Sequence, residues 1–118
     1  MISRIWHGYT TPENAEKYQA IVTDEVIPGI LEMHIPGFER IELFRKDRDT
    51  DVEFITVMWF RDIASVRAFV GEDYERCHVP ARARAVLSRF DARSQHYQVL
   101  LERTAIQPPV STKRPSSA

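Results

Sequence analysis

The segment Val52–Phe60 places the strongest constraint on how this chain can fold. Its sequence, VEFITVMWF, is apolar at nearly every position, so both faces of an extended strand would carry apolar side chains. Strands of this kind are typical of the middle of a sheet, where other layers cover both faces. We therefore expect a central strand here, with one layer of structure packed on each side of it.

The residues before this segment predict a strand, a helix and a second strand. Residues 2–9 alternate in polarity, and Thr11 followed by Pro12 is a typical helix start. Apolar residues then recur at helical spacing, at Ala15, Tyr18, Val22, Val26 and Ile30. Pro28 lacks an N–H group and crowds the preceding turn, so we expect a kink or a break in this helix. A strand over residues 38–45 follows.

The residues after the central strand repeat this order. Asp62 is expected to cap a second helix that ends at Gly71, and a short helix over residues 81–88 precedes a last strand over residues 92–102. The order strand, helix, strand, strand, helix, strand predicts an α+β fold of the ferredoxin-like, split β-α-β type. Its four-stranded antiparallel sheet carries helices on one face, with the first strand between the third and the fourth.

One face of this predicted sheet has no cover. Two helices cover one face, and we expect Trp6 and one face of the central strand to point to the other. An exposed apolar sheet face usually marks an interface. We therefore expect a homodimer that packs sheet on sheet into a dimeric α+β barrel.

The chain divides into a predicted domain, residues 1–103, and a tail, residues 104–118. The tail holds three prolines and three serines and little apolar material, so it cannot bury enough surface to offset the entropy of ordering it. We expect the tail to be mobile.

Composition narrows the classes of function. Sixteen Lys and Arg against seventeen Asp and Glu give a net charge of −1, whereas a nucleic-acid-binding protein would show a basic excess. We interpret the basic run as a solvated face or a set of salt bridges; it comprises Arg76, Arg82, Arg84, Arg89 and Arg93. The single cysteine, Cys77, excludes an internal disulfide framework. No apolar run approaches the roughly 20 residues that cross a bilayer, so we expect a cytoplasmic protein without a membrane partner.

Four stretches of the chain resemble the antibiotic biosynthesis monooxygenase (ABM) family of dimeric α+β barrels. They are EVIPGI, IPGFERIELFRK, EFITVMWF and DIASVRAFVGEDYERC, and the resemblance covers about residues 2–102. The resemblance implies a monooxygenase that uses no cofactor: a small aromatic or quinol-type substrate is deprotonated in a pocket between sheet and helices and reduces O2 itself. Such chemistry requires an apolar pocket, a proton acceptor and polar groups that stabilise a developing anion.

Two histidines are the candidate catalytic residues. His7 is a general-base candidate by residue type, and His96 lies on the last strand, which should pair with the first and bring the two imidazoles close together. The resemblance also suggests residues that bind the substrate, namely Tyr9, Trp59, Phe69, Tyr74 and His78.

Two other functions remain open. Some ABM-like proteins degrade heme, and the spacing from Trp59 places His78 where they hold the iron ligand. However, His7 stands where those enzymes have an asparagine, and Ala68 stands where they have a tryptophan. Heme bound through His78 is therefore an alternative to a protein without a cofactor. The other alternative is a ligand-binding or stress-associated barrel without catalytic activity, in which the histidines and aromatic residues serve only packing or binding.

Overall fold

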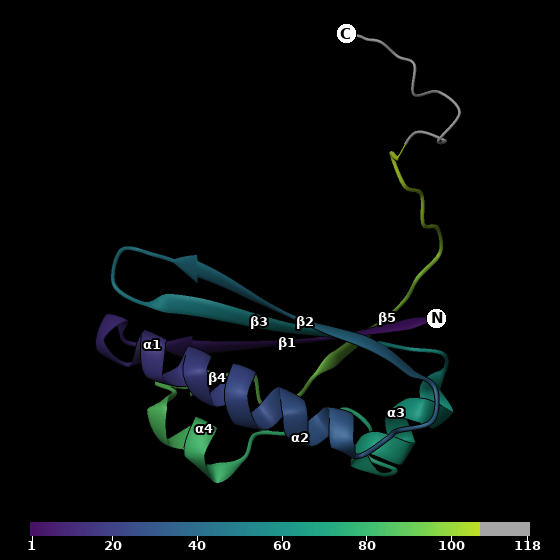
Figure 1. Ribbon diagram of the computed structural model, residues 1–118, viewed down its shortest axis with the longest axis horizontal. Coiled ribbons are helices and arrows are strands. Elements are labelled where there is room, and N and C mark those ends of the chain that lie inside the picture. The colour runs from purple at the N-terminus through teal and green to yellow at the C-terminus, as the bar shows by residue number, and fades with distance from the viewer. Residues whose placement is uncertain (107–118) are drawn as a thin grey trace, which may run out of the picture.

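The computed structural model describes residues 1–106, and the greater part of the predicted tail, residues 107–118, lies outside the described residues. The elements in chain order are β1 Ile2–Thr10, α1 Pro12–Ile21, the π-helical segment η1 Val22–Val26, α2 Ile27–Glu32, β2 Phe38–Asp47, β3 Val52–Phe60, α3 Ile63–Val70, α4 Ala81–Val86, β4 Arg89–Phe90 and β5 Gln95–Gln98. Figure 1 shows one sheet with the helices gathered on one of its two faces. The predicted α+β architecture is confirmed.

The sheet is antiparallel, with strand order β2-β3-β1-β4, and β5 also pairs with β1. The central position of β3 and the position of β1 between the third and last strands are as predicted. The sheet has five strands and not four, because the short strand β4 lies before the range predicted for the last strand, residues 92–102. Within that range, only β5 (Gln95–Gln98) forms. It ends early because Gln98 already pairs with Ile2, and the Val99 N–H donates to the carbonyl of Met1 at 3.0 Å. No residue of β1 remains beyond that point to pair with.

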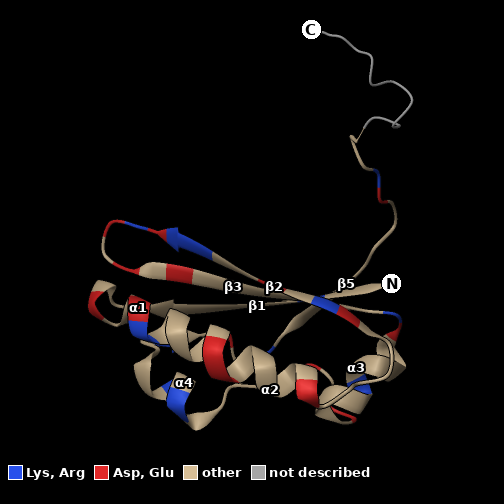
Figure 2. Cartoon of the chain, viewed as in Figure 1, with Lys and Arg blue, Asp and Glu red and all other residues tan. Residues whose placement is uncertain are grey.

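The long helical run from Pro12 to Glu32 is not broken at Pro28. Thr11 caps its start as predicted, because the Asn14 N–H donates to Thr11 Oγ1 at 3.3 Å. The helix widens in η1, where the Ile27 N–H donates to the carbonyl of Val22, five residues back. This wider turn accommodates the missing N–H and the ring of Pro28 without ending the helix. Charged residues also connect this helical run to α4. Figure 2 shows acidic positions along the run and basic positions on α4, and Glu25 of η1 forms an ion pair with Arg82 of α4.

The alternation of side chains along the strands decides what faces the helices. Phe54 and Phe60 on β3 are fully buried on the helix side, in two core clusters completed by helical residues such as Tyr18 and Phe69. Trp6 also lies on this side, 8% exposed, and its Nε1–H donates to the carbonyl of Asp91 at 2.9 Å. The expectation that Trp6 points to the uncovered face was therefore wrong.

The other face of the sheet carries no helix within residues 1–106. Strand alternation places apolar side chains there, namely Ile5, Phe44, Ile55, Val57, Trp59 and Tyr97. We call this set the outer face. Helices thus cover β3 on one side only; on the outer face, Phe44 and Tyr97 are 47% and 55% exposed, whereas Val57 is only 5% exposed.

A close approach at Gly37 allows a specific prediction. Gly37 has φ +82°, and a Cβ added there would lie 2.0 Å from Ser65 Oγ on α3, which is itself buried. Gly37→Ala is therefore expected to lower the free energy of unfolding by about 2–4 kcal/mol, through backbone strain and overpacking. Gly29 in α2 is the matched control, because a Cβ there meets nothing within 4 Å. Gly29→Ala is expected to raise the free energy of unfolding by about 0.5–1 kcal/mol in urea denaturation. Equal effects at the two positions would contradict this account.

Candidate functional site

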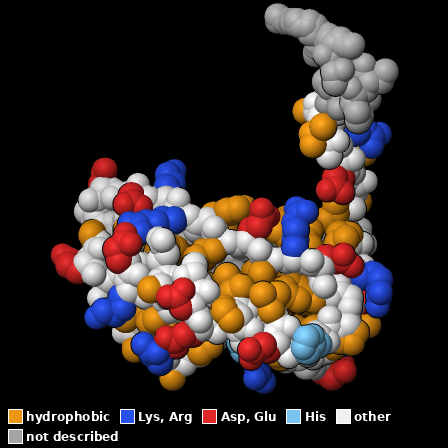
Figure 3. Space-filling view, in the orientation of Figure 1, with side chains coloured by type: hydrophobic (Ala, Val, Ile, Leu, Met, Phe, Trp, Pro, Cys, Tyr) orange, Lys and Arg blue, Asp and Glu red, His pale blue; other side chains and the backbone are white. Residues whose placement is uncertain are grey.

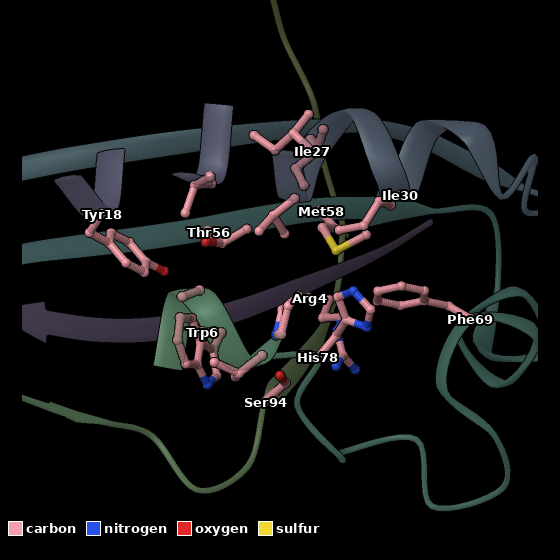
Figure 4. A pocket seen from close by; sticks show the side chains of 16 residues that line it. Arg4, Trp6, Tyr18, Ile27, Ile30, Thr56, Met58, Phe69, His78 and Ser94 are labelled. Atoms are coloured by element: carbon pink, nitrogen blue, oxygen red, sulfur yellow. The ribbon is translucent and has the colours of Figure 1, made fainter. Parts of the chain in front are cut away.

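A cavity lies on the helix side of the sheet, between β1 and β3 and the helices α1, α2 and α4. Its lining is mostly apolar, with Arg4, Trp6, Tyr18, Thr56, His78 and Ser94 as the residues that bring polar groups. The centres of water molecules can occupy a volume of about 50 Å³ inside it. Figure 4 shows Arg4, His78 and Ser94 at one end of the cavity, while Tyr18 and Trp6 lie at the other. Hydrophobic side chains also gather between β2 and α2 in Figure 3. An apolar cavity with a few polar groups at one end is typical of a small-molecule site.

Arg4 is the charged residue of the cavity, and it is almost completely buried. It is 3% exposed on β1, where Nη1 donates to the carbonyl of Tyr74 and Nη2 to that of Arg76, each at 2.6 Å. Burial lowers the pKa of Arg4 to about 10, so the guanidinium remains protonated at neutral pH. Among the described residues, no carboxylate forms an ion pair with Arg4.

His96 lies on the same side of the sheet and contacts the guanidinium. Its Nε2 is 3.0 Å from Arg4 Nη1, and β5 places it directly beside Arg4 in the register. Burial, with a smaller effect from the Arg4 charge, lowers the pKa of His96 to about 4, against the opposing effect of Glu75. His96 is therefore neutral at pH 7, and Nε2 accepts the hydrogen bond because a guanidinium can only donate. We interpret His96 as a residue that positions Arg4.

His78 faces the cavity from the loop between α3 and α4. Its ring packs against the Phe69 ring with centroids 5.1 Å apart, and it forms no hydrogen bond with another described residue. Burial lowers the pKa of His78 below its usual 6.5, and the positive charges of Arg4 and Arg76 lower it further. The imidazole is therefore neutral at pH 7. It is the cavity's available proton acceptor.

The predicted pair of histidines is separated by the sheet. His7 lies on the outer face, where its Nδ1 is 2.8 Å from Glu53 Oε2, while His96 lies on the helix side. The hydrogen bond from His7 holds the pKa of Glu53 below its usual value. The expectation that the two imidazoles lie close together was wrong. His96 pairs with Arg4 in the register and shares its face of the sheet, whereas His7, three residues further along β1, points to the opposite face.

The predicted substrate-binding residues divide in the same way. Phe69 and His78 line the cavity. Tyr74 lies beside it, where its carbonyl accepts from Arg4 and its ring packs edge-on against His96 at 5.2 Å. Tyr9 and Trp59 lie on the opposite face, where the Arg40 guanidinium stacks 4.1 Å from the Trp59 ring centroid. The sequence reasoning missed Arg4 and Ser94. The signal for Arg4 was its position in the sequence, because residues 2, 4 and 6 share one face of a strand and Arg4 therefore lies between Ile2 and Trp6.

A second concavity adjoins the cavity and carries basic residues. It is lined by Arg76, Arg84 and Arg93 and shares His78, Val79 and Pro80 with the cavity. We call it the basic groove. Arg93 pairs with Asp73 and Glu75. Among the described residues, Arg76 and Arg84 form no ion pair, and the Arg84 guanidinium lies 5.3 Å from the Phe90 ring centroid. Within residues 1–106, no group of three His, Cys, Asp or Glu side chains is placed to hold a metal ion. No described helix is long and apolar enough to cross a membrane.

Comparisons with known proteins relate this fold to a family of solved structures. No family model and no curated protein matches the sequence. A putative antibiotic biosynthesis monooxygenase from Bacillus cereus is similar in structure, with a TM-score of 0.65 and 15% identity over 91% of this chain and 98% of that one. The heme degrader MhuD from Mycobacterium tuberculosis, solved with two hemes in its active site, gives a TM-score of 0.59 and 15% identity over 88% and 100%. SnoaB, a cofactor-independent oxygenase from Streptomyces nogalater, gives a TM-score of 0.51 and 15% sequence identity over 90% of this chain and 98% of that one. The chain therefore has the fold of the antibiotic biosynthesis monooxygenase-type proteins.

Proposed function

We propose that the protein is a cofactor-independent monooxygenase that oxidises a small phenol or quinol in the cavity between sheet and helices. The observation that carries the proposal is the placement of His78, a neutral imidazole without a hydrogen-bond partner among the described residues, in an apolar cavity beside a buried cation. Solved structures with this fold include a putative monooxygenase and a cofactor-independent oxygenase, which supports the same chemistry. His78 takes the role first expected of His7 and His96.

The reaction needs only the substrate, O2 and a base. His78 takes the proton of the phenolic O–H, and the resulting imidazolium stays beside the phenolate and stabilises it. The electron-rich ring then reduces O2. One oxygen atom forms a bond to a ring carbon, and the other leaves as water with two hydrogens from the substrate. The apolar lining excludes bulk water, which strengthens the interaction between the imidazolium and the phenolate.

Oxygen uptake tests the proposal directly. The purified protein is incubated with a panel of single-ring phenols and hydroquinones in an oxygen electrode, and the products are analysed by mass spectrometry under ¹⁸O2. We expect uptake above the buffer rate for at least one member and one labelled oxygen atom in the product. The absence of uptake above buffer across the panel would reject the monooxygenase and favour a barrel that only binds its ligand.

Heme does not fit the cavity as it stands. The likeness to MhuD and the position of His78 raise this alternative. A volume of about 50 Å³ is room for several water molecules and not for a tetrapyrrole. Trp6 and Tyr18 fill the space at the end opposite His78. We therefore propose no heme-dependent step.

We also propose that the protein forms a homodimer through the outer face. The support is the apolar set on that face, which no described element covers, including Phe44 at 47% exposed. Sedimentation at micromolar concentration is expected to give the mass of a dimer. Phe44→Asp is expected to shift the protein toward the monomer, because it places a charge in the interface. Lys17→Asp, on α1 of the helix side, is the charge control and should leave the dimer intact. A wild-type protein that sediments as a monomer would contradict the proposal.

A further inference from the structure

Arg4 presents a buried positive charge that no described residue neutralises. A charge removed from water is costly unless an anion or a full set of hydrogen bonds compensates it. Arg4 is 3% exposed, its hydrogen-bond partners are two backbone carbonyls and a neutral histidine, and its guanidinium lies over the Phe69 ring, 5.4 Å from the centroid. None of these partners carries a negative charge. Arg45, by comparison, pairs with Glu16 and Asp47 on the surface. The cation of the cavity therefore lacks the anion that a buried arginine usually has.

The donors of Arg4 show where an anion would bind. A guanidinium has five N–H groups. Nη1 directs its two toward the Tyr74 carbonyl and His96 Nε2, and Nη2 uses one for the Arg76 carbonyl. The Nε–H and the second Nη2–H have no acceptor among the described residues. Nε and Nη2 stand side by side in the planar guanidinium, and this pair of nitrogens can bind both oxygens of a carboxylate.

Two features near Arg4 fit the same ligand. Ser94, at the same end of the cavity, is 1% exposed, and its Oγ has no hydrogen-bond partner among the described residues. Its hydroxyl group can donate to an anionic oxygen. The basic groove adjoins this end through His78, and there Arg76 and Arg84 lack ion-pair partners within residues 1–106. Unpaired cations beside a site raise the local concentration of an anionic ligand.

We infer that the substrate of this cavity is a small phenol that also bears a carboxylate, and that Arg4 binds the carboxylate through its Nε and Nη2 edge. This inference rests on the proposed function for the phenol and on Arg4 for the carboxylate. The phenolic O–H lies toward His78, the ring against the apolar lining, and Ser94 donates to the same carboxylate. Arg4 is then the residue that determines specificity, and His96 acts through it as a positioning residue.

A matched pair of ligands tests this inference without turnover. Binding of 3-hydroxybenzoate and of its neutral amide, 3-hydroxybenzamide, is measured by calorimetry at pH 7.5 under argon. The wild-type protein is expected to bind the acid about 10–100-fold more tightly than the amide, since charge-assisted hydrogen bonds distinguish the two. Arg4→Met should remove this preference and leave amide binding within about twofold, because the apolar contacts remain. Arg48→Met removes a cation from the loop between β2 and β3, outside the cavity, and should leave the preference unchanged.

Each outcome separates this inference from the proposed function. Equal wild-type affinity for acid and amide would overturn the inference, even where oxygen uptake with neutral phenols supports the monooxygenase. A preference for the acid without oxygen uptake on any phenol would leave the carboxylate site standing and reject the oxygenase. Circular dichroism shows whether Arg4→Met folds. If it does not, the comparison of acid and amide in the wild-type protein decides the question, and the preference for the acid is expected to persist at high salt because Arg4 is buried. A preference that disappears at high salt would place the selectivity on exposed cations and overturn the inference.

Discussion

His78→Gln is expected to lower kcat/KM for the oxidised phenol by about 10²–10⁴-fold, the contribution typical of a general base. The glutamine keeps a polar side chain of similar size at the edge of the cavity and the contact with Phe69, but it cannot take up a proton. The wild-type rate is expected to rise with pH and to level off below pH 6.5. Burial and the charges of Arg4 and Arg76 lower the pKa of His78, so its neutral form persists to more acidic pH. The variant should lack this dependence.

His7→Gln is the matched control for this experiment. His7 lies on the outer face and pairs with Glu53, so its replacement should change kcat/KM by less than about threefold. Steady-state oxygen uptake over a range of pH compares the three proteins. A large loss in His7→Gln together with wild-type rates in His78→Gln would place the chemistry on the outer face and contradict the site described above.

Phe54→Ala is expected to have the largest effect on stability. Phe54 is fully buried on β3, and its ring packs against that of Tyr18 with centroids 4.8 Å apart. Its truncation should lower the free energy of unfolding by about 3–5 kcal/mol, from lost burial and the cavity left behind. That is a large share of the roughly 5–15 kcal/mol that stabilises a typical domain. Urea denaturation followed by circular dichroism measures the change.

Leu31→Ala provides the control for this truncation. Leu31 lies on α2 and is 52% exposed, so its loss should change the free energy of unfolding by about 0.5 kcal/mol or less. A loss below about 1 kcal/mol for Phe54→Ala would mean that the cluster around Tyr18 does not form the core described here.

The order of the elements was predictable because it depends on local signals. Thr11 and Asp62 cap their helices through their own side chains, and Gly71, with φ +98°, ends α3. The end of the last strand was not predictable in this way. Val99, Leu100 and Leu101 have the composition of a strand, but β5 ends where β1 offers no further partner, a fact of register that no local pattern contains.

A pocket with aromatic residues and a histidine was predictable, but Arg4 and Ser94 were not, and neither were the sheet faces on which the residues lie. Both faces of β1 carry apolar and polar side chains, with Arg4 and Trp6 on one and Ile5 and His7 on the other. The sequence alone therefore does not decide which of the two sets faces the helices. If the strand is turned over, every side chain of β1 moves to the opposite face of the sheet. The deciding contacts are long-range. Asp91 accepts from Trp6, and the carbonyls of Tyr74 and Arg76 accept from Arg4, all more than 65 residues away along the chain.

The two tryptophans allow the most direct test of the central claim, that ligand binds on the helix side of the sheet. Trp6 lines the cavity and Trp59 lies on the outer face, so Trp59→Phe and Trp6→Phe each leave one reporter. Titration with an aromatic ligand found in the binding or uptake experiments should quench Trp6 saturably in Trp59→Phe. The fluorescence of Trp59 in Trp6→Phe should stay unchanged apart from linear inner-filter loss. Saturable quenching of Trp59 with no response from Trp6 would place the ligand on the outer face and contradict the account.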